Sequence, residues 1–141
     1  MPKAVLRSDR VWDPVRVQHP GHAYAQPFSQ AVKASGQSLI FLSGQVALAA
    51  NGDVVGAGDM RAQARQALEN LKAMLDAGGA TLADVVKLTV YVTDMREFSK
   101  LQEVRAEYWA GISLPASTAL EVTQLVRKEF MVEIEAIAVV D

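Results

Sequence analysis

Apolar and polar residues alternate most clearly over residues 131–140, near the end of the chain. Successive side chains of a β-strand point to opposite faces, so this alternation predicts a strand. One of its faces is wholly apolar and belongs to the core: Val132, Ile134, Ala136, Ala138 and Val140. The other face carries Glu133 and Glu135 among aliphatic residues. Either these carboxylates face solvent, where Lys87 or Arg127 could pair with Glu133, or they line a cleft.

Two further segments alternate in the same way, over residues 84–93 and 117–122. In the first of them, an apolar face is formed by Val86, Leu88, Val90 and Val92. The other face of that segment holds Val85, Lys87, Thr89, Tyr91 and Thr93. Both segments are therefore predicted strands, each with one more apolar and one more polar face.

Two segments repeat their apolar residues at the helical spacing of three and four positions. The first begins at Asp59, whose carboxylate suits an N-cap, and ends at two glycines, residues 78–79. Its predicted core stripe is Met60, Ala64, Ala67, Leu68, Leu71, Met74 and Leu75. The second begins at Asp94, spaced as a capping box with Glu97, and ends at Gly111. Its stripe is Phe98, Leu101, Val104, Tyr108 and Trp109, with Arg105 on or beside it.

The first third of the chain is less regular. Prolines interrupt residues 1–27 too often for a helix, so this part is predicted as an arm that lies on the surface or across a neighbouring subunit, with residues 15–18 as a short strand in it. Residues 29–34 and 37–43 flank a Ser-Gly turn, and this pattern predicts a hairpin. Gly44 then interrupts an apolar run, which indicates a bulge or a close approach of the backbone to another group, with a simple bend as the alternative.

The predicted order is strand, strand, helix, strand, helix, strand, strand. Two helices on one face of a mostly antiparallel sheet make an α+β fold, a two-layer sandwich. The sheet face away from the helices is predicted to hold Lys87, Thr89, Tyr91, Ser117, Glu121, Glu133, Glu135, Ile137 and Val139. A half-apolar face that helices leave uncovered is typical of contact with another subunit.

The residue composition limits the classes of protein to which the chain can belong. The chain has 141 residues, half of them hydrophobic, which suffices for one domain with its own core. It has no cysteine, so disulfides and thiolate catalysis are excluded. His19 and His22 are the only histidines, and no cysteine or third histidine accompanies them. We therefore expect neither a metal site nor a cofactor.

The net charge and the distribution of apolar residues limit the kinds of partner that the chain can bind. The net charge is −2 and no basic cluster occurs, which argues against binding to nucleic acid. No apolar run is long enough to span a membrane. Residues 1–13 lack the apolar core of a signal peptide, so we expect a cytoplasmic protein.

Six motifs stand in a fixed order along the chain. They are Gln-Pro-Phe-Ser-Gln-Ala-Val (26–32), Phe-Leu-Ser-Gly-Gln (41–45), Asn-Leu-Lys with Leu75, Gly78 and Gly79 (70–79), Val-Lys-Leu-Thr-Val-Tyr-Val-Thr-Asp (86–94), Leu-Pro-Ala (114–116) and Val-Glu-Ile-Glu-Ala-Ile-Ala (132–138). Together they resemble the Rid family, also called RidA/YjgF, whose older name is L-PSP endoribonuclease. The resemblance implies a chorismate-mutase-like α+β fold that assembles as a homotrimer, with a small-molecule cleft at each subunit interface. We expect an N-terminal arm over residues 1–25 and one Rid-family domain over residues 26–141.

The resemblance also implies a reaction, in which water attacks an enamine or imine and ammonia leaves. A Glu on the last strand handles the water, and it is kept here as Glu133. An Arg after Pro-Ala holds the substrate carboxylate in active members, but Ser117 stands at that position here. Losing such a charged pair costs about 2–5 kcal/mol, which argues against the usual 2-aminoacrylate-type substrates.

Other pocket positions implied by the resemblance are partly kept. Phe28 stands at a Tyr position without its hydroxyl, and Gln102 stands at the usual Asn position of the second helix. The full set of candidate substrate-binding residues is Phe28, Ser29, Ser43, Gly44, Tyr91, Gln102 and Ser117. Ser117 either binds a less anionic substrate through its hydroxyl or is a remnant of a lost site. Arg105 or Arg127 could replace the missing clamp, although neither lies at the motif position.

Two functions follow from these residues. The first is a hydrolase that deaminates a reactive enamine, imine or related small metabolite, with Glu133 as the catalytic residue. The second is a non-catalytic trimer that binds a small molecule in a regulatory or chaperone-like role. Ribonuclease activity rests on the older family name alone, and the charge balance speaks against it. The expected partners are a small-molecule ligand and further copies of the chain, with neither nucleic acid nor membrane.

Overall fold

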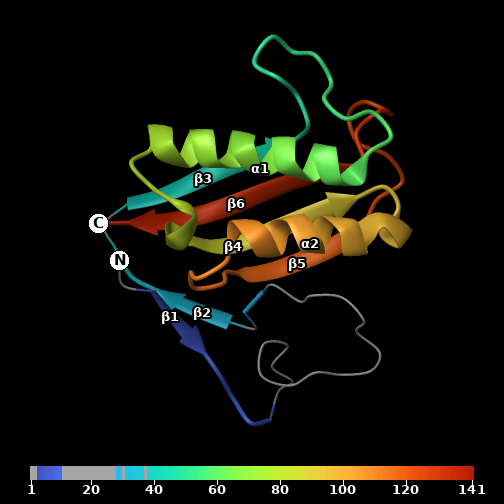
Figure 1. The fold of residues 1–141 in the computed structure, drawn as a ribbon. Coiled ribbons are helices and arrows are strands. Elements are labelled where there is room, and N and C mark those ends of the chain that lie inside the picture. Colours follow the sequence, from blue (N-terminus) through green and yellow to red (C-terminus); the bar gives the residue numbers. More distant parts are fainter. Residues whose placement is uncertain (1–2, 11–27, 30, 37) are drawn as a thin grey trace.

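The computed structural model of the chain describes residues 3–10, 28–29, 31–36 and 38–141. Its elements in chain order are β1 (Lys3–Leu6), β2 (Ala31–Ala34), β3 (Ser38–Gln45), α1 (Met60–Ala77), η1 (Leu82–Asp84), β4 (Val85–Val92), η2 (Met95–Glu97), α2 (Phe98–Tyr108), β5 (Ala116–Glu121) and β6 (Val132–Val140). Figure 1 shows α1 and α2 side by side over one face of a four-stranded sheet, with β1 and β2 as a separate pair beneath it.

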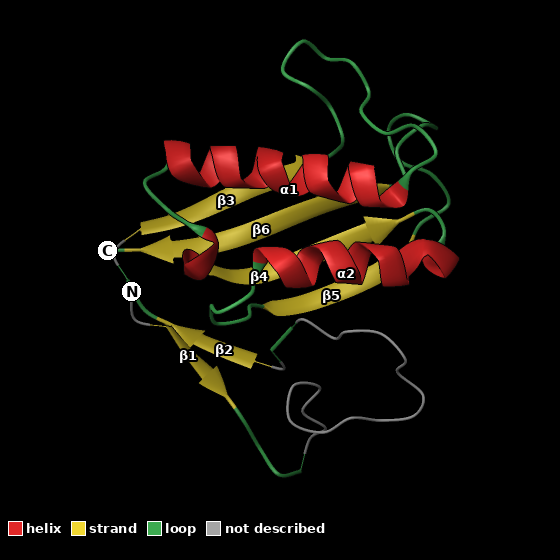
Figure 2. Cartoon of the chain, in the orientation of Figure 1, coloured by secondary structure: helices red, strands yellow, loops and turns green. Residues whose placement is uncertain are grey.

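The main sheet has the strand order β3-β6-β4-β5. β6 runs antiparallel to both β3 and β4, whereas β4 and β5 are parallel. The predicted α+β class, with two helices on one face of a mostly antiparallel sheet, is therefore confirmed (Figure 2). A parallel pair needs a crossover connection, and η2 with α2 supplies it between β4 and β5.

Helix α1 begins where the sequence predicts. The Asp59 carboxylate accepts a hydrogen bond from the Ala62 backbone N–H at 3.1 Å. After the helix, Gly79 has a φ of 76°, a left-handed conformation that glycine adopts easily at helix ends. The prediction that Met74 belongs to the core is wrong, because its side chain is 52% exposed. Gln63 is fully buried instead.

Helix α2 begins later than the sequence predicts. The Asp94 carboxylate accepts from the Arg96 backbone N–H at 3.0 Å, and η2 forms before α2 starts at Phe98. The first turn is therefore a tight 3₁₀ turn. The apolar stripe of α2 packs into the core as predicted, and Arg105 lies on it with a relative exposure of 1%.

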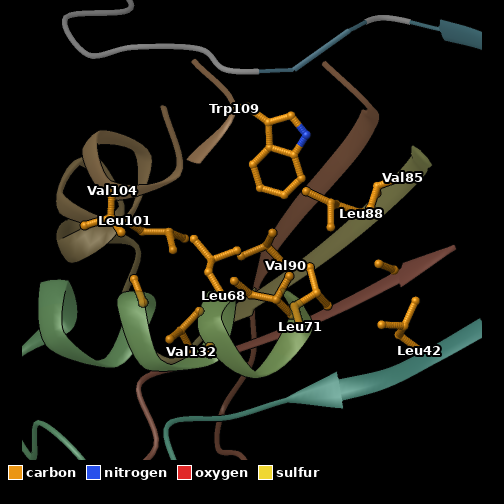
Figure 3. Close-up of a cluster of buried hydrophobic side chains, with 14 of the residues drawn as sticks. Leu42, Leu68, Leu71, Val85, Leu88, Val90, Leu101, Val104, Trp109 and Val132 are labelled. Carbon is orange, nitrogen blue, oxygen red and sulfur yellow. The ribbon is translucent and has the colours of Figure 1, made fainter. Parts of the chain in front are cut away.

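One apolar core fills the space between the helices and the sheet. Figure 3 shows Leu68 and Leu71 of α1 among the same cluster as Leu101 of α2 and Val90 and Val132 of the sheet. Burying a Leu or Val side chain fully is worth about 1.5–3 kcal/mol, so this cluster holds both helices against the sheet. The opposite face of the sheet is the one that remains open.

The predicted hairpin of residues 29–34 with residues 37–43 is wrong. β2 pairs antiparallel with β1, from the pair Lys3 and Ala34 to the pair Leu6 and Ala31. Residues 3–6, predicted as part of an irregular arm, are thus a strand. Lys3 anchors that strand to the main domain, since its Nζ donates to three backbone carbonyls at 2.7–3.2 Å.

The predicted alternation in β4 holds except at its first two residues. Val85 is fully buried and Val86 is not, because the register between β4 and β6 shifts between Val85 and Lys87. Such a bulge inserts one extra residue and moves the side chains before it to the other face. From Lys87 onward the predicted faces are observed.

Residues 11–27 lie outside the described part of the chain. The short strand predicted at residues 15–18, and the histidines His19 and His22, fall in that segment. Within the described ranges, no helix combines the length and the apolar content that crossing a bilayer requires.

Candidate functional site

Glu133 lies on the sheet face that the helices leave open. It is half-buried in β6 and lies opposite Tyr91 of β4. Its carboxyl group packs against the backbone of Gly44, where an added methyl group would lie 2.5 Å from Glu133 Cδ and 2.8 Å from Oε2. The β3–β6 register also shifts between Leu42 and Gln45. The predicted irregularity of the strand and the predicted close approach at Gly44 are therefore both observed, and the group that approaches is Glu133.

Two amides of α1 hold the segments that carry Gly44 and Glu133. Asn70 Nδ2 donates to two backbone carbonyls just after β3, both at 2.9 Å. Gln63 Oε1 accepts from the Met131 backbone N–H at 2.8 Å, two residues before Glu133. Its Nε2 donates to two further carbonyls, at 2.8 and 3.3 Å. The helix layer thus fixes the backbone on both sides of the Glu133 carboxyl group.

Neither ion pair considered for Glu133 forms within the chain. Lys87 Nζ donates to Thr118 Oγ1 at 2.7 Å, and Arg127 lies 3.8 Å from the Glu129 carboxylate. The Glu133 carboxyl group accepts no hydrogen bond from the residues that the structure describes. A half-buried carboxylate without a partner is suited to bind water or a ligand.

Glu135, two residues further along β6, does have a partner. Tyr91 Oη donates to Glu135 Oε1 at 2.7 Å. This hydrogen bond is the main reason why the pKa of Tyr91 is raised above its ordinary value, and the Glu133 charge adds a smaller effect in the same direction. Beside Glu135 lies a hollow of ≈ 280 Å³, whose polar lining is Ser43, Lys87, Thr89 and Glu135 and whose remaining lining is apolar.

Ser29 and Ser117 lie near β5, at the edge of the sheet opposite β3. The Ser29 side chain is 6% exposed. The Ser29 backbone forms an isolated parallel bridge with Ala116 of β5. Its N–H donates to the Pro115 carbonyl at 2.8 Å, and its hydroxyl donates to the Leu114 carbonyl at 2.5 Å. The half-buried Phe28 precedes it. Two sequence motifs that are far apart along the chain are therefore neighbours in the fold.

The prediction that Ser117 and Glu121 share a face with Glu133 is wrong. In the parallel register Ser117 lies opposite Leu88, whose side chain is buried under the helices. Glu121, on the same side of β5, accepts from the Met95 backbone N–H at 2.8 Å, in the helix layer. Side chains switch faces at each residue. The register of a strand with its neighbour therefore decides which of its side chains point to the open face of the sheet.

On that side of β5, α2 contributes two buried polar residues. Gln102 and Arg105 are each 1% exposed. Burial lowers the pKa of the Arg105 guanidinium to about 10. The resemblance implies Gln102 as a site residue, and it leaves Arg105 as one of two alternatives to the arginine expected at the Ser117 position. The signal for Arg105 was its position on the apolar stripe of α2.

Within one chain, the candidate residues therefore form two separate groups. The Glu133 group, on the open face, is Ser43, Gly44, Tyr91 and Glu133. The Ser117 group, around β5 and α2, is Phe28, Ser29, Gln102 and Ser117. In register, Ser117 and Glu133 are three residues and two strands apart, or roughly 14 Å between Cα atoms, and they point to opposite faces. One chain does not bring the two groups together.

The fold and the Glu133–Gly44 contact define the class, a two-layer α+β protein with a carboxylate held on its open sheet face. Comparison with known proteins identifies the family. The family described as Endoribonuclease L-PSP matches residues 20–140. A RutC family protein of Pyrococcus horikoshii is 47% identical over 112 residues, which are 79% of this chain and 86% of the relative.

Two further comparisons support the same family. The 2-iminobutanoate/2-iminopropanoate deaminase of Mus musculus is 42% identical over 113 residues, which are 80% of this chain and 81% of the relative. The crystal structure of YyfB, a Rid family protein from Yersinia pestis, aligns with a TM-score of 0.86 at 33% identity and covers 99% of both chains. The chain therefore belongs to the Endoribonuclease L-PSP family, the Rid family, as its six motifs predict.

Proposed function

We propose that this chain is a hydrolase that deaminates a reactive enamine, imine or related small metabolite. The observation that carries the proposal is the Glu133 carboxyl group, which packs against the Gly44 backbone on the open face and has no hydrogen bond to the described residues. A carboxylate in this position can take a proton from a water molecule and return it to a leaving group. The name of the mouse relative, an imine deaminase, supports the same chemistry.

In the proposed reaction, Glu133 accepts a proton from water while the water oxygen attacks the carbon of the C=N bond. The imine nitrogen takes up a proton from solvent, which gives a carbinolamine. Glu133 then returns its proton to that nitrogen as the C–N bond breaks, the hydroxyl of the carbinolamine loses its proton to solvent, and ammonia and a carbonyl compound leave. An enamine enters the same sequence after protonation at carbon. Imine and water are consumed and no cofactor is required.

We further propose that the site is completed by a second copy of the chain, in a homotrimer. The Glu133 group and the Ser117 group lie on opposite faces of the sheet and stay apart within one chain, so a cleft that uses both groups requires a second copy. Repeated head-to-tail contacts of this kind close into a ring. Leu39 and Phe41, 60% and 71% exposed on the open face, support burial of that face in the assembly.

The function is tested by measuring ammonia release from a panel of imines generated enzymatically in the assay. The wild type is expected to accelerate the release, and Glu133→Gln to lower the rate by about 10²- to 10⁴-fold. Glu103→Gln is the matched control, because Glu103 is exposed on α2 and pairs with Arg61. Full activity in Glu133→Gln would sink the mechanism.

The assembly is tested by sedimentation. A chain of 15.2 kDa is expected to sediment as a particle of about 46 kDa. A monomer at assay concentrations would contradict the proposed inter-subunit site, because the two groups would then stay apart.

A second candidate function is binding without catalysis, in a regulatory or chaperone-like trimer. Ser117 and Phe28 favour it, since they lack the guanidinium and the hydroxyl that active family members are expected to have at these positions. No ammonia release from any imine, together with a rise of the Tm on addition of a 2-oxo acid, would favour this function over the first.

A further inference from the structure

Helix α1 carries two amide side chains whose hydrogen bonds reach the segments on either side of the Glu133–Gly44 contact. Gln63 is fully buried, and its amide makes three hydrogen bonds with backbone groups outside α1. Asn70 makes two such bonds through Nδ2. Asn70 belongs to one of the six motifs of the chain, and the reaction proposed above uses neither amide directly.

The ladder between β3 and β6 does not itself hold Gly44 against Glu133. The two strands pair without a gap up to Leu42, and the register then shifts before the last pair, Gln45 with Ile134. Neither Gly44 nor Glu133 belongs to a pair between these two strands. A bulge of this kind leaves the extra residue unpaired and lets the strand bend. At this point β6 is paired with β4, but not with the strand that carries Gly44, so the contact depends on groups outside the β3–β6 ladder.

Gln63 holds the start of β6. Its Oε1 accepts from the Met131 backbone N–H at 2.8 Å. Its Nε2 donates to the Glu129 carbonyl at 2.8 Å and to the Gly56 carbonyl at 3.3 Å. The same amide thus joins the chain just before β6 to the loop that follows β3. Leaving a buried polar group without its hydrogen bond is costly, so the amide favours one placement of both segments.

Asn70 holds the end of β3. Its Nδ2 donates to the carbonyls of Val46 and Leu48, both at 2.9 Å. These residues follow Gly44 by two and four positions. The Oδ1 of Asn70 accepts from Gln66 Nε2 at 2.9 Å, which orients the amide so that its donor side faces the two carbonyls. The backbone just after Gly44 is therefore attached to α1.

Both amides belong to one rigid element. Gln63 and Asn70 are seven positions apart, which is about two turns of an α-helix. They therefore lie on the same face of α1, about 10 Å apart along its axis. The buried stripe of α1 fixes this helix on the core (Figure 3). The helix thus sets the spacing between the end of β3 and the start of β6, on which the Glu133–Gly44 contact depends.

We propose that Gln63 and Asn70 are positioning residues, which hold Glu133 and the Gly44 backbone in the relative arrangement that the reaction requires. Neither amide contacts the substrate in this scheme. Gln63 places the strand that carries the carboxyl group, and Asn70 places the backbone against which that group packs. The consequence for catalysis rests on the proposed function, whereas the contact itself can be observed without turnover.

Steady-state kinetics of ammonia release test the catalytic consequence. Gln63→Met keeps a long side chain and removes the amide. It should lower kcat at least about 10-fold and change KM little, because it displaces a reacting group and not a binding group. Asn70→Leu should have the same effect. Leu71→Ala is the matched control, since it destabilises the same helix through a cavity in the core and should keep the kcat of the wild type.

A double variant shows whether the Gln63 amide acts through the carboxyl group. Gln63→Met should slow the Glu133→Gln protein by less than about 2-fold, because the group that the amide positions is already absent. A further loss of about 10-fold would overturn the inference. It is also overturned if Gln63→Met keeps the kcat of the wild type, or if Gln63→Met and Leu71→Ala lose kcat equally. If Gln63→Met does not fold, Asn70→Leu decides by the same outcomes.

Nuclear magnetic resonance measures the contact without turnover. In protein labelled at glycine and glutamate, the wild type should show a cross-peak between Gly44 Hα and Glu133 Hγ, because a Cβ at Gly44 would lie 2.6 Å from Glu133 Cγ. Gln63→Met should lose this cross-peak and Leu71→Ala should keep it. A cross-peak of unchanged intensity in Gln63→Met, or none in the wild type, would overturn the inference.

The two measurements together separate this inference from the proposed function. If the wild type releases no ammonia while Gln63→Met loses the cross-peak, the proposed function fails and the positioning of the contact stands. If the wild type releases ammonia while Gln63→Met keeps both kcat and the cross-peak, the inference fails and the function stands.

Discussion

A methyl group added at Gly44 should inactivate the protein through Glu133 while it leaves the fold intact. In the structure, the new Cβ would lie 2.5 Å from Glu133 Cδ and 2.6 Å from Cγ, whereas ordinary contacts begin at 3.4 Å. The carboxyl group must therefore move by about 1 Å, since it is the end of a flexible side chain and the backbone of β6 is fixed. Gly44→Ala thus perturbs the position of one group.

The expected magnitudes follow from that displacement. Misplacing a reacting group by about 1 Å can cost about 10²-fold in rate, so kcat/KM should fall by about that factor. The change in the free energy of unfolding should be small. A shifted rotamer costs about 0.5–1.5 kcal/mol, while replacing glycine by alanine in a strand restores about 0.5–1 kcal/mol.

Ammonia release and urea denaturation of four proteins measure both quantities: the wild type, Gly44→Ala, Glu133→Gln and the double variant. If Gly44→Ala acts only through Glu133, the double variant should be no slower than Glu133→Gln alone. The reasoning is refuted if Gly44→Ala keeps full activity while Glu133→Gln loses it. It is equally refuted if Gly44→Ala slows the Glu133→Gln protein by a further factor of about 10².

Three further predictions concern stability. Gln63→Ala removes three hydrogen bonds with backbone groups and should lower the free energy of unfolding by about 2–4 kcal/mol in urea denaturation, whereas Gln66→Ala, whose amide bonds only the Asn70 side chain, should cost under about 1 kcal/mol; equal costs would contradict the role of Gln63. Leu71→Ala should cost about 2–5 kcal/mol, and a similar cost for the exposed Met74→Ala would contradict the observed core. Burial raises the pKa of Tyr108 to about 12, above the value near 10 of an unfolded chain, so its stabilising effect is complete below pH 10 and is lost as the pH rises through 12. The Tm of the wild type should therefore fall more steeply from pH 10 to 12 than the Tm of Tyr108→Phe, and parallel curves would refute the shift.

The parts of the fold that depend on local pattern could be predicted from the sequence. The helical spacing of apolar residues predicts both helices, and the alternation of apolar and polar residues predicts β4, β5 and β6. The pairing partners could not be found in this way. β2 pairs with β1, and Lys3 of β1 donates to carbonyls about 80 positions further along the chain, contacts that no local pattern encodes. A hairpin was the nearest local alternative for the same apolar residues.

The error at Ser117 has the same physical origin. Alternation shows that Ser117 and Glu121 share a face, but the register with β4 decides which face that is. β5 pairs in parallel with β4, after a helical crossover between the two strands. The prediction of a mostly antiparallel sheet does not specify this parallel pair. The consequence for function is large, because the observed register places Ser117 on the face of the sheet opposite Glu133.

The candidate site shows why matching single positions to a family is insufficient. Position by position, the motifs lead to the expectation that Glu133 handles the water and that Ser117 stands in place of an arginine. The structure changes what that substitution implies, because Ser117 lies opposite the buried Leu88 and on the other face of the sheet from Glu133. A match by position cannot detect this, since the face to which a strand residue points depends on the register with the neighbouring strand.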